Sequence, residues 1–389
     1  MITSLNKRRV VMTVANEFTT DYRVFREASA LTKTGYDVTV LCVYRKGLSR
    51  KEEREGVHVR RVLEQHLRLP VSRRARLVRR AWWQALTQQP ADIYHAHDRD
   101  ALDLTARAAQ RFNVPFIYDS HEFWPDKNTY ENNTGSLRDR LSERWWSAKE
   151  KRYAGRASAI IMTSPGHAQG LRLLYDVAAP VIVRNIPEFQ RGTDKSILRK
   201  KFNLTEQDKI IVYSGNIQRN RGLEQTIAAL LFLPKLVHLV IIGYGPYKKN
   251  LQESVALDLA NRVHFMDAIP FTELIPTQHS ADLGIAPFQA NCFSHRHVLP
   301  NKPFEYMMAE LPVAVSNLAE LRDLVRTVDY GETFNPDDPR DIAHAVNKIL
   351  SDPRLAQRYR QNASRASQKT YRWDLEQQQL LKLYHRLLP

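Results

Sequence analysis

Short runs of β-branched and aromatic residues alternate with longer segments of helical periodicity along this chain, and the alternation occurs in two series. The first series begins with VVMTVAN at 10–16 and ends with APVIVRN at 179–185. The second begins with KIIVYSG at 209–215 and ends in three successive helical patterns that reach residue 388. Strands that alternate with helices form βαβ units, in which helices cover both faces of a parallel sheet. The sequence therefore predicts an α/β protein with two doubly wound parallel sheets.

The segment 186–204 separates the two series. It is polar and contains proline and glycine, which is typical of a linker between domains. We therefore expect one domain over residues 1–186, a second over 187–370, and a helix over 371–389 that packs back on the first domain. Because open parallel sheets bind ligands at the carboxyl ends of their strands, we expect the two sheets to face each other across a cleft.

Positive charge exceeds negative charge, mostly in the first half of the chain. The 58 Lys and Arg residues against 42 Asp and Glu residues give a formal net charge of +16. Residues 1–190 contribute +11 of this excess, and residues 191–389 contribute +5. Such a balance indicates an anionic partner, and nucleic acid, a phosphate-bearing ligand and an anionic membrane are the candidates. The alternative is a surface that only keeps the protein in solution.

Cysteine usage and hydropathy indicate a cytoplasmic protein. The two cysteines, Cys42 and Cys292, lie far apart in the sequence, which excludes a disulfide framework and a cysteine-based zinc ribbon. The longest apolar run, 236–243, has about half the length that a membrane-spanning helix needs. The N-terminal segment lacks the apolar core of a signal peptide.

Several common catalytic motifs are absent from the sequence. There is no GxxxxGK[ST] loop and no GxSxG motif, and Gly243-Tyr244-Gly245 lacks the third glycine of a dinucleotide fingerprint. His95 and His97 would share one face of a strand and could ligate a metal ion together with Asp98. The remaining spacing of a metallohydrolase is missing. The pattern therefore favours polar residues at the end of a strand, and we expect no metal.

The segment LPNKPFEYMMAELPV at 299–313 predicts a helix that begins at the carboxyl end of a strand. Asn301 is expected to cap the helix, and Pro303 is tolerated in its first turn. The free amides and dipole of a helix N-terminus attract phosphate. Glu305 could accept hydrogen bonds from sugar hydroxyls, although an acidic residue in a first turn can also serve only the helix.

A strongly basic helix is predicted over residues 71–88. Its segment 71–83 holds five arginines and two tryptophans. Such a helix is typical of binding to an anionic lipid surface. The alternative is a helix whose apolar face packs on the protein while its arginines face solvent; that face holds Val71, Ala75, Val78, Trp82 and Ala85. No RNP, KH or helix-turn-helix pattern supports a nucleic-acid partner.

Several of these segments together resemble the retaining glycosyltransferases of family 4. In the second half these are NIPEF, VYSGNIQRNRGLEQTIAAL, VIIGYGPYKKNL, ADLGIAPF and the segment 299–313, in that order. The segments DYRVFREASALTKTGYDVTVL, DIYHAHD and YDSHEFW in the first half, and TYRWDLEQQQLLKLYHRLL at the end, are similar to the same family.

This resemblance implies a GT-B fold of two Rossmann-like domains. It also implies metal-independent transfer of a sugar, with retention at the anomeric carbon, from a UDP- or GDP-type donor and without a further cofactor. The expected acceptor is a saccharide or a lipid-linked molecule in the synthesis of a surface polysaccharide, lipopolysaccharide or glycolipid. The basic segment 71–83 would suit a peripheral enzyme on the inner face of the plasma membrane.

By the same resemblance, two pairs of residues hold the donor. The family has an Arg and then a Lys around the diphosphate; here the Lys position is Arg221 and the Arg position is Asn216, so one cation is missing. Arg219, Arg296 and Lys302 are candidates to replace it. The family also has two glutamates spaced E-x7-E, of which the first falls on His297 and the second, expected to hold the ribose, on Glu305. The full predicted donor set is Asn216, Arg221, Gly243, Gly245, His297, Asn301, Lys302, Pro303, Phe304 and Glu305.

The first domain is expected to bind the acceptor. His121 matches a family histidine that lies against the transferred sugar, and with Arg221 and Glu305 it forms the predicted catalytic set. The predicted acceptor set is Thr20, Asp21, Arg23, His97, Asp98 and Glu122, with Arg99, Asp100 and Asp126 nearby. The first loop lacks the glycine pair that is common in the family, and we expect Arg23 to approach a phosphate in its place.

Two other functions remain as alternatives. The departures at Asn216 and His297 fit a GT-B protein that binds a sugar nucleotide, has lost catalysis and serves as a partner subunit. His121, Arg221 and Glu305 argue against this reading. A phosphate-using GT-B enzyme, such as a sucrose-type synthase or a phosphorylase, usually has a longer chain.

Overall fold

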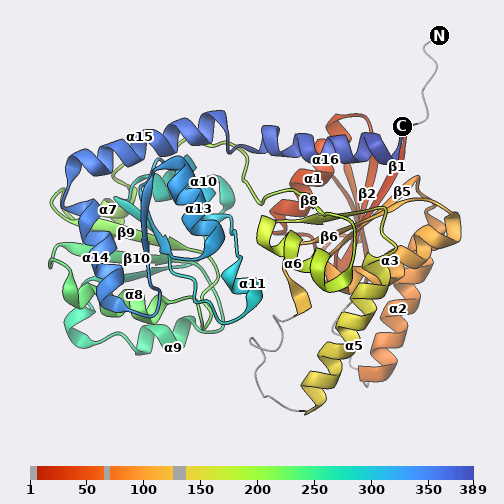
Figure 1. Ribbon diagram of the computed structural model, residues 1–389, viewed down its shortest axis with the longest axis horizontal. Helices are drawn as coiled ribbons and strands as arrows, with labels where there is room; N and C mark the ends of the chain where they lie inside the picture. Colours follow the sequence, from red (N-terminus) through yellow and green to blue (C-terminus); the bar gives the residue numbers. More distant parts are fainter. Residues whose placement is uncertain (1–6, 65–70, 126–136) are drawn as a thin grey trace, which may run out of the picture. The chain divides into compact units, whose positions relative to one another are not determined.

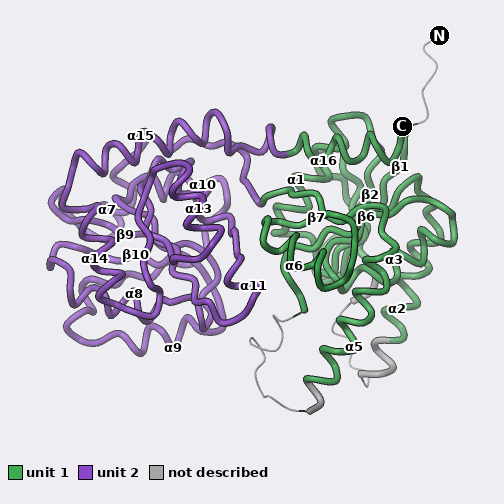
Figure 2. The backbone as a smooth tube through the Cα atoms, viewed as in Figure 1, with its two compact units in different colours: residues 1–184, 377–389 green, residues 185–376 purple. Residues whose placement is uncertain are grey.

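The structure is a computed structural model that describes residues 7–64, 71–125 and 137–389, without the side chains of 63–64, 71–75 and 137–139. The chain divides into two compact units, as Figure 2 shows. Unit 1 comprises Met1–Arg184 and Gln377–Pro389, and unit 2 comprises Asn185–Glu376. The expectation that the two sheets face each other across a cleft stays a prediction.

Unit 1 is built on an eight-stranded sheet with the order β3-β4-β2-β1-β5-β6-β7-β8. Neighbouring strands are parallel except for β3 and β4, which form an antiparallel pair at one edge. The sequence analysis missed β3 because its residues, KEER, are charged and solvated. The strands are β1 (Arg9–Thr13), β2 (Asp37–Tyr44), β3 (Lys51–Arg54), β4 (Val57–Glu64), β5 (Ile93–His97), β6 (Phe116–Ser120), β7 (Ala159–Met162) and β8 (Val181–Ile182).

The helices of unit 1 follow the predicted pattern closely. Right-handed crossovers place α1 and α3 on opposite faces of the sheet, because β1 leads to β2 on one side and β5 leads to β6 on the other (Figure 1). Asp21 caps α1 by accepting from the amide of Val24 at 3.2 Å, and Gly35, with a φ of +99°, follows its end. The helices are α1 (Tyr22–Lys33), α2 (Val71–Gln88), α3 (Asp98–Phe112), α5 (Leu137–Ala154) and α6 (Pro165–Tyr175).

Unit 2 holds a six-stranded, fully parallel sheet with the order β11-β10-β9-β12-β13-β14. The four central strands, β9, β10, β12 and β13, are almost fully buried, which explains why they are near-continuous apolar runs in the sequence. The strands are β9 (Lys209–Ser214), β10 (Val237–Ile242), β11 (Val263–Met266), β12 (Leu283–Ala286), β13 (Val313–Ser316) and β14 (Gly331–Phe334).

The helices of unit 2 connect these strands and then extend beyond them. Two of them, α7 and α11, were not predicted. The α-helices are α7 (Ile197–Phe202), α8 (Leu223–Ala229), α9 (Lys248–Glu253), α10 (Phe271–His279), α11 (Phe293–Arg296), α12 (Lys302–Met308), α13 (Ala319–Val328), α14 (Pro339–Leu350) and α15 (Pro353–Lys369).

The segment that was expected to be a linker is largely part of unit 2. Leu198 of α7 is fully buried, and the guanidinium of Arg199 bonds to the carboxylate of Asp282 at 2.8 Å and to the carbonyl of Ser280 at 3.0 Å. Composition alone does not reveal that Arg199, one of the charged residues of 186–204, is buried with its acceptors. The unit boundary lies after Arg184, two residues before the predicted one.

The last helix, α16 (Trp373–Leu387), is divided between the two units after Glu376. Within unit 1 its Tyr384 hydroxyl forms a hydrogen bond with Nδ1 of His95 at 2.8 Å. The ring of Tyr384 also packs edge-on against Tyr36, with centroids 5.6 Å apart. None of the helices in the described ranges is long and apolar enough to cross a membrane.

Candidate active site

In unit 2 the direction of the strand connections reverses between β9 and β12. β9 leads to β10 on one side of the sheet, and β12 leads to β13 on the other. Open parallel sheets bind their ligands outside the carboxyl ends of the strands at such a point. The loop 215–222 follows β9, and the segment 287–301 follows β12. These two segments therefore form the candidate donor site.

Glycines allow neighbouring loops to approach closely at this edge of the sheet. Gly243 and Gly245 have φ angles of +153° and +158°. A Cβ atom on Gly243 would collide with the carbonyl oxygen of Gly215, and one on Gly245 would collide with that of Ile217. The two glycines thus pack the loop after β10 against the loop after β9. Their predicted contact with the donor stays a prediction.

Two cations converge on one aromatic ring beside these loops. The guanidinium of Arg221 lies 4.9 Å from the ring centroid of Phe288, and the ammonium of Lys302 lies 5.3 Å from the same centroid. Lys302 is 8% exposed, and burial, followed by the charge of Arg221, lowers its pKa to about 8. Of the cations proposed to compensate for Asn216, Lys302 is the one that lies here. Arg296 is exposed, and Arg219 is exposed and lies over Tyr247.

Glu305 lies on α12 in the first turn, as predicted, and is 2% exposed. Its carboxylate accepts a hydrogen bond from the side-chain amide of Asn301. The expectation that the Asn301 side chain caps the helix is wrong, because Asn301 has helical backbone angles and bonds to Glu305 instead. Asn301 therefore orients the carboxylate that the resemblance assigns to the ribose.

Two predicted donor residues lie in the core. Phe304 is fully buried and its ring packs against Tyr371 with centroids 5.6 Å apart, and its assignment as a donor contact stays a prediction. Pro303 is buried in the first turn, and its carbonyl accepts from Tyr330 at 3.3 Å. Both residues fix α12 on the sheet, because α12 is buried along its whole length.

The two positions that depart from the family pattern differ in their surroundings. Asn216 is exposed, and its backbone carbonyl accepts from the hydroxyl of Tyr213 at 2.8 Å. His297 follows α11, and its Nδ1 lies 3.2 Å from a carboxylate oxygen of Glu320 at the start of α13. A carboxylate therefore lies close to the position where the family has its first glutamate. The sequence analysis missed Glu320 because the contact joins segments 23 residues apart.

In unit 1 the corresponding reversal lies between β1 and β5, and Asp98 follows β5 directly. Asp98 has a φ of +60° and accepts from the backbone amide of His121 at 3.0 Å and from the indole of Trp124 at 3.0 Å. Its second oxygen lies 3.2 Å from Nδ1 of His121. The other ring nitrogen of His121 lies 3.2 Å from Nδ1 of His97. Asp98 thus holds both the backbone and the ring of the predicted catalytic histidine.

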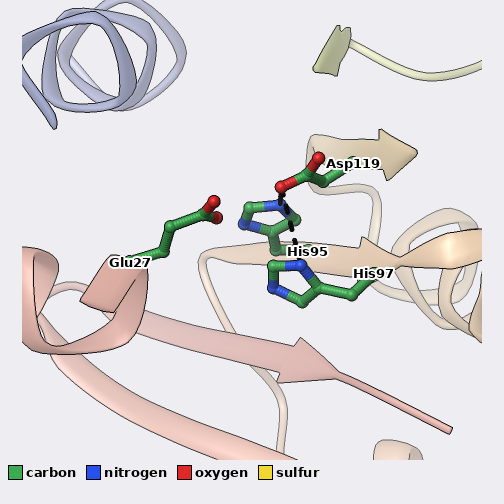
Figure 3. A group of neighbouring side chains, drawn as sticks. All are labelled: Glu27, His95, His97 and Asp119. Carbon is green, nitrogen blue, oxygen red and sulfur yellow. Dashed lines mark ion pairs between the residues drawn. The ribbon is translucent and has the colours of Figure 1, made fainter. Parts of the chain in front are cut away.

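A buried polar cluster, whose four side chains Figure 3 shows, adjoins this site through Asp119, 3.8 Å from Nε2 of His121. One potential ligand atom from each of Glu27, His95, His97 and Asp119 lies within 4.8 Å of the others, and all four side chains are fully buried. Burial lowers the pKa of His95 to about 4 and holds the pKa of His97 well below its usual value. Both histidines are therefore neutral at physiological pH.

Arg23 supplies the positive charge of this cluster. Its guanidinium bonds to both oxygens of Asp119, at 2.9 and 3.1 Å, and lies 3.1 Å from Glu27. Burial opposes ionisation of Asp119, but Arg23 and the neighbouring histidines together outweigh it, so the pKa of that carboxyl is lowered. Burial and the neighbouring Asp119 raise the pKa of Glu27 well above its usual value. The HxH pair therefore belongs to a network whose cation is an arginine. The expectation of no metal ligand stays a prediction.

Both halves of the chain match known protein families. A family model described as Glycosyl transferase 4-like domain matches residues 21–185, and one described as Glycosyl transferases group 1 matches residues 194–366. The chain belongs to the family 4 type of glycosyltransferases. An uncharacterized glycosyltransferase of Methanocaldococcus jannaschii is 25% identical over 197 residues, which cover 49% of this chain and 48% of the relative. The chain thus matches about half the length of that relative.

Solved structures show the fold of this glycosyltransferase to be GT-B. A sucrose-phosphate synthase from Thermosynechococcus elongatus superposes with a TM-score of 0.82 at 18% identity, over 98% of this chain and 99% of the other. The Anabaena protein HepE in complex with UDP superposes with a TM-score of 0.74 at 15% identity, over 97% and 100% of the two chains. The predicted fold class is confirmed.

The acceptor residues predicted for this glycosyltransferase fall into two groups. Thr20 is exposed, and Asp98 and Glu122 are partly exposed, so they stay candidates. The assignments of Arg23 and His97 to a ligand surface are wrong as placed here, because both belong to the buried cluster. The carboxylate of Asp21 caps α1 and accepts a hydrogen bond from the side-chain amide of Asn16 at 2.7 Å.

Other residues named beside the acceptor set also separate by burial. Arg99 is buried and paired with Glu143 at 3.1 Å, and Asp100 is exposed. Asp126 lies outside the described residues. The sequence analysis missed Glu27 and Asp119. One signal could have found them: each is a carboxylate in an element that is otherwise largely buried, Glu27 in α1 and Asp119 in β6. A buried carboxylate requires a cationic or hydrogen-bonding partner.

Proposed function

We propose that this glycosyltransferase moves a sugar from a nucleoside-diphosphate donor of the UDP or GDP type to a saccharide or lipid-linked acceptor. The group formed by Arg221, Lys302 and Glu305 at the carboxyl edge of the second sheet carries this proposal. It offers two cations for a diphosphate and an oriented carboxylate for ribose hydroxyls. The UDP in the HepE complex supports a nucleotide donor by analogy of fold.

The chemistry explains why these residue types are needed. Breaking the anomeric bond leaves negative charge on the departing diphosphate while an oxocarbenium-like centre forms on the sugar. Preorganised cations stabilise such a leaving group in the transition state. His121 would lie against the sugar, held in place by Asp98. We further propose that the anomeric configuration is retained, which NMR of the product would establish.

A thermal-shift titration tests the proposed donor. UDP, GDP and their common sugar conjugates are added to the wild type, to Glu305→Gln and to Glu253→Gln, whose side chain is exposed on α9. A ligand at 100 times its Kd should stabilise the wild type by about 2.7 kcal/mol. We expect a shift with one base that Glu305→Gln weakens and Glu253→Gln does not. The absence of a shift with every nucleotide would contradict the proposal.

Turnover distinguishes catalysis from the alternative, a sugar-nucleotide-binding partner subunit. The exposed Asn216 is the observation that favours this alternative, because no cation stands at the family position. Release of the nucleoside diphosphate is measured with membrane-extracted lipid-linked acceptors and with free saccharides. Binding without release in every case would favour the partner subunit.

We also propose that unit 1 contacts an anionic membrane surface during synthesis of a surface polysaccharide, lipopolysaccharide or glycolipid. The apolar face of α2 is not the contact surface, because Trp82 and Ala85 are buried in unit 1. Large apolar side chains are instead exposed on α2 and α5 at Leu77 (44%), Leu141 (55%) and Trp145 (58%). Exposed arginines flank them at positions 76, 79, 80, 140 and 144.

The two helices are held together through α3. Asp103 of α3 pairs with Arg79 of α2 at 2.6 Å and with Lys149 of α5 at 3.2 Å. Vesicle flotation tests the surface with neutral and with anionic lipid. We expect recovery on anionic vesicles only, and its loss in a Leu141→Ser/Trp145→Ser variant. Equal recovery on both lipids would contradict the membrane proposal.

A further inference from the structure

The side chain of Lys302 is largely buried, and its ammonium group has no partner. Within the described ranges it makes neither a hydrogen bond nor an ion pair, although the residue is only 8% exposed. The ammonium lies over the rings of Tyr213 and Phe288, at 5.2 and 5.3 Å from their centroids. A buried charge is costly unless it is paired. The arrangement therefore calls for an anion that the chain itself does not provide.

We propose that Lys302 and Arg221 together bind the diphosphate of the donor, and that Lys302 replaces the cation missing at Asn216. This inference rests on the proposed function, since it concerns the same nucleotide donor. It goes beyond it by assigning the second phosphate-binding cation to the helix α12 instead of to the loop after β9.

The backbone at the end of β9 makes room for this lysine. Gly215 has a φ of +135°, and a Cβ atom there would lie 2.6 Å from Nζ of Lys302 and 2.8 Å from its Cε. A side chain at 215 would therefore displace the ammonium group. Asn216, the position that lacks the family cation, is the next residue along this loop. Lys302 thus brings its charge to the same loop from α12.

The charged and titratable groups that face Lys302 come from three elements. Arg221, on the loop after β9, repels the ammonium, whereas Glu305 on α12 attracts it. Burial raises the pKa of Tyr213 on β9 to about 12, so that ring is neutral. Burial and Arg221 together leave the pKa of Lys302 at about 8. A bound diphosphate would favour the charged form, so donor binding should take up a proton near pH 8 and weaken as pH rises above it.

Calorimetric titration with UDP and GDP tests the assignment on four proteins. These are the wild type, Lys302→Met, Lys302→Met/Asn216→Arg, and Lys249→Met, which changes an exposed lysine on α9. A hydrogen bond to a charged group corresponds to an affinity loss of about 10–100-fold when it is removed. We expect that loss at pH 7 in Lys302→Met, partial recovery in the double variant and no change in Lys249→Met.

Two further measurements separate a phosphate contact from a general disturbance. Uridine and guanosine, which carry no phosphate, should bind Lys302→Met as they bind the wild type. Titration of the wild type at pH 8 in two buffers of different ionisation enthalpy should show proton uptake, and Lys302→Met should not. Wild-type affinity for the diphosphate retained in Lys302→Met would overturn the role of Lys302 alone. No binding of any nucleotide to the wild type would overturn the proposed function with it.

Discussion

Units 1 and 2 both bring charged side chains to the carboxyl edge of a parallel sheet, but they balance the charges in different ways. In unit 1 the cation Arg23 is bonded to Asp119 and lies 3.1 Å from a carboxylate oxygen of Glu27, all within the core. In unit 2 Arg221 and Lys302 lie beside one aromatic ring, and the nearest carboxylate, Glu305, is held by Asn301.

This difference separates charges that stabilise the fold from charges that await a ligand. A buried ion pair that is complete within the chain holds elements together. Removing one partner leaves the other as an uncompensated buried charge, which destabilises the fold. A buried cation without an acceptor lowers stability, and a protein retains such a group where a ligand supplies the acceptor. Mutations that neutralise charge should therefore have opposite effects on stability in the two units.

The largest effect is expected for Asp119→Ala. The substitution removes the carboxylate that accepts two hydrogen bonds from Arg23, so the buried guanidinium keeps only Glu27 and the carbonyl of Val183. Breaking such a buried pair costs about 3–5 kcal/mol. Urea denaturation followed by tryptophan fluorescence measures it, because five of the six tryptophans lie in unit 1. Asp323→Ala, which changes an exposed carboxylate, serves as the control. A loss below about 1 kcal/mol would show that the Arg23 pair is not what stabilises this core.

The next effect has the opposite sign and concerns Lys302 of unit 2. Its pKa is about 8 in the folded protein, whereas an unperturbed lysine has a pKa of 10.5. Between these values the unfolded chain binds the proton and the folded chain does not, so the free energy of unfolding should rise with pH from 8 to 10.5. The rise amounts to about 3 kcal/mol at 1.36 kcal/mol per pKa unit.

Lys302→Met should therefore be more stable than the wild type at pH 7, with the advantage disappearing above pH 10.5. Denaturation followed by circular dichroism at pH 7, 9 and 10.5 checks this without any ligand. Lys249→Met is again the control. A destabilised Lys302→Met at pH 7 would mean that the lysine is a structural residue, and the contrast between the two units would fail.

The sequence predicted the alternation of strands and helices well because buried parallel strands are long apolar runs. It missed β3, whose charged residues carry no such signal, and α7, a single short helix in which three of six residues are basic. Among site residues, Glu305 and Lys302 were found because the helix pattern at 299–313 places them next to a strand end. Asp119 was missed because its partner Arg23 lies 96 residues away, a distance that no periodicity spans.

The third prediction concerns pH and His95 in unit 1. The pKa of His95 is about 4 in the folded protein, whereas an unperturbed histidine has a pKa of 6.5, because burial disfavours the charged form. Its contribution to stability is present above pH 6.5 and is lost as pH falls toward 4, a change of about 3 kcal/mol. The raised pKa of Glu27 changes stability with pH in the opposite direction. The effect of His95 is therefore isolated by comparing the wild type with a His95 variant.

His95→Gln should therefore lose less stability than the wild type when pH falls from 6.5 to 4, as measured by urea denaturation at half-unit steps. His58→Gln, which changes an exposed histidine, should follow the wild type. If the free energies of unfolding of His95→Gln and the wild type change in parallel with pH, protonation of His95 is not what destabilises unit 1 at low pH.

The smallest effect is expected for Tyr384→Phe, which tests whether α16 is joined to the cluster of unit 1. The change removes the hydroxyl that bonds to Nδ1 of His95 and retains the ring that packs against Tyr36. Removing one neutral hydrogen bond should cost about 1 kcal/mol. The same loss should be smaller in a His95→Gln background, because bonded residues are not additive. Equal losses in both backgrounds would mean that the hydroxyl of Tyr384 does not stabilise unit 1 through His95, and that α16 is not joined to the buried cluster by this hydrogen bond.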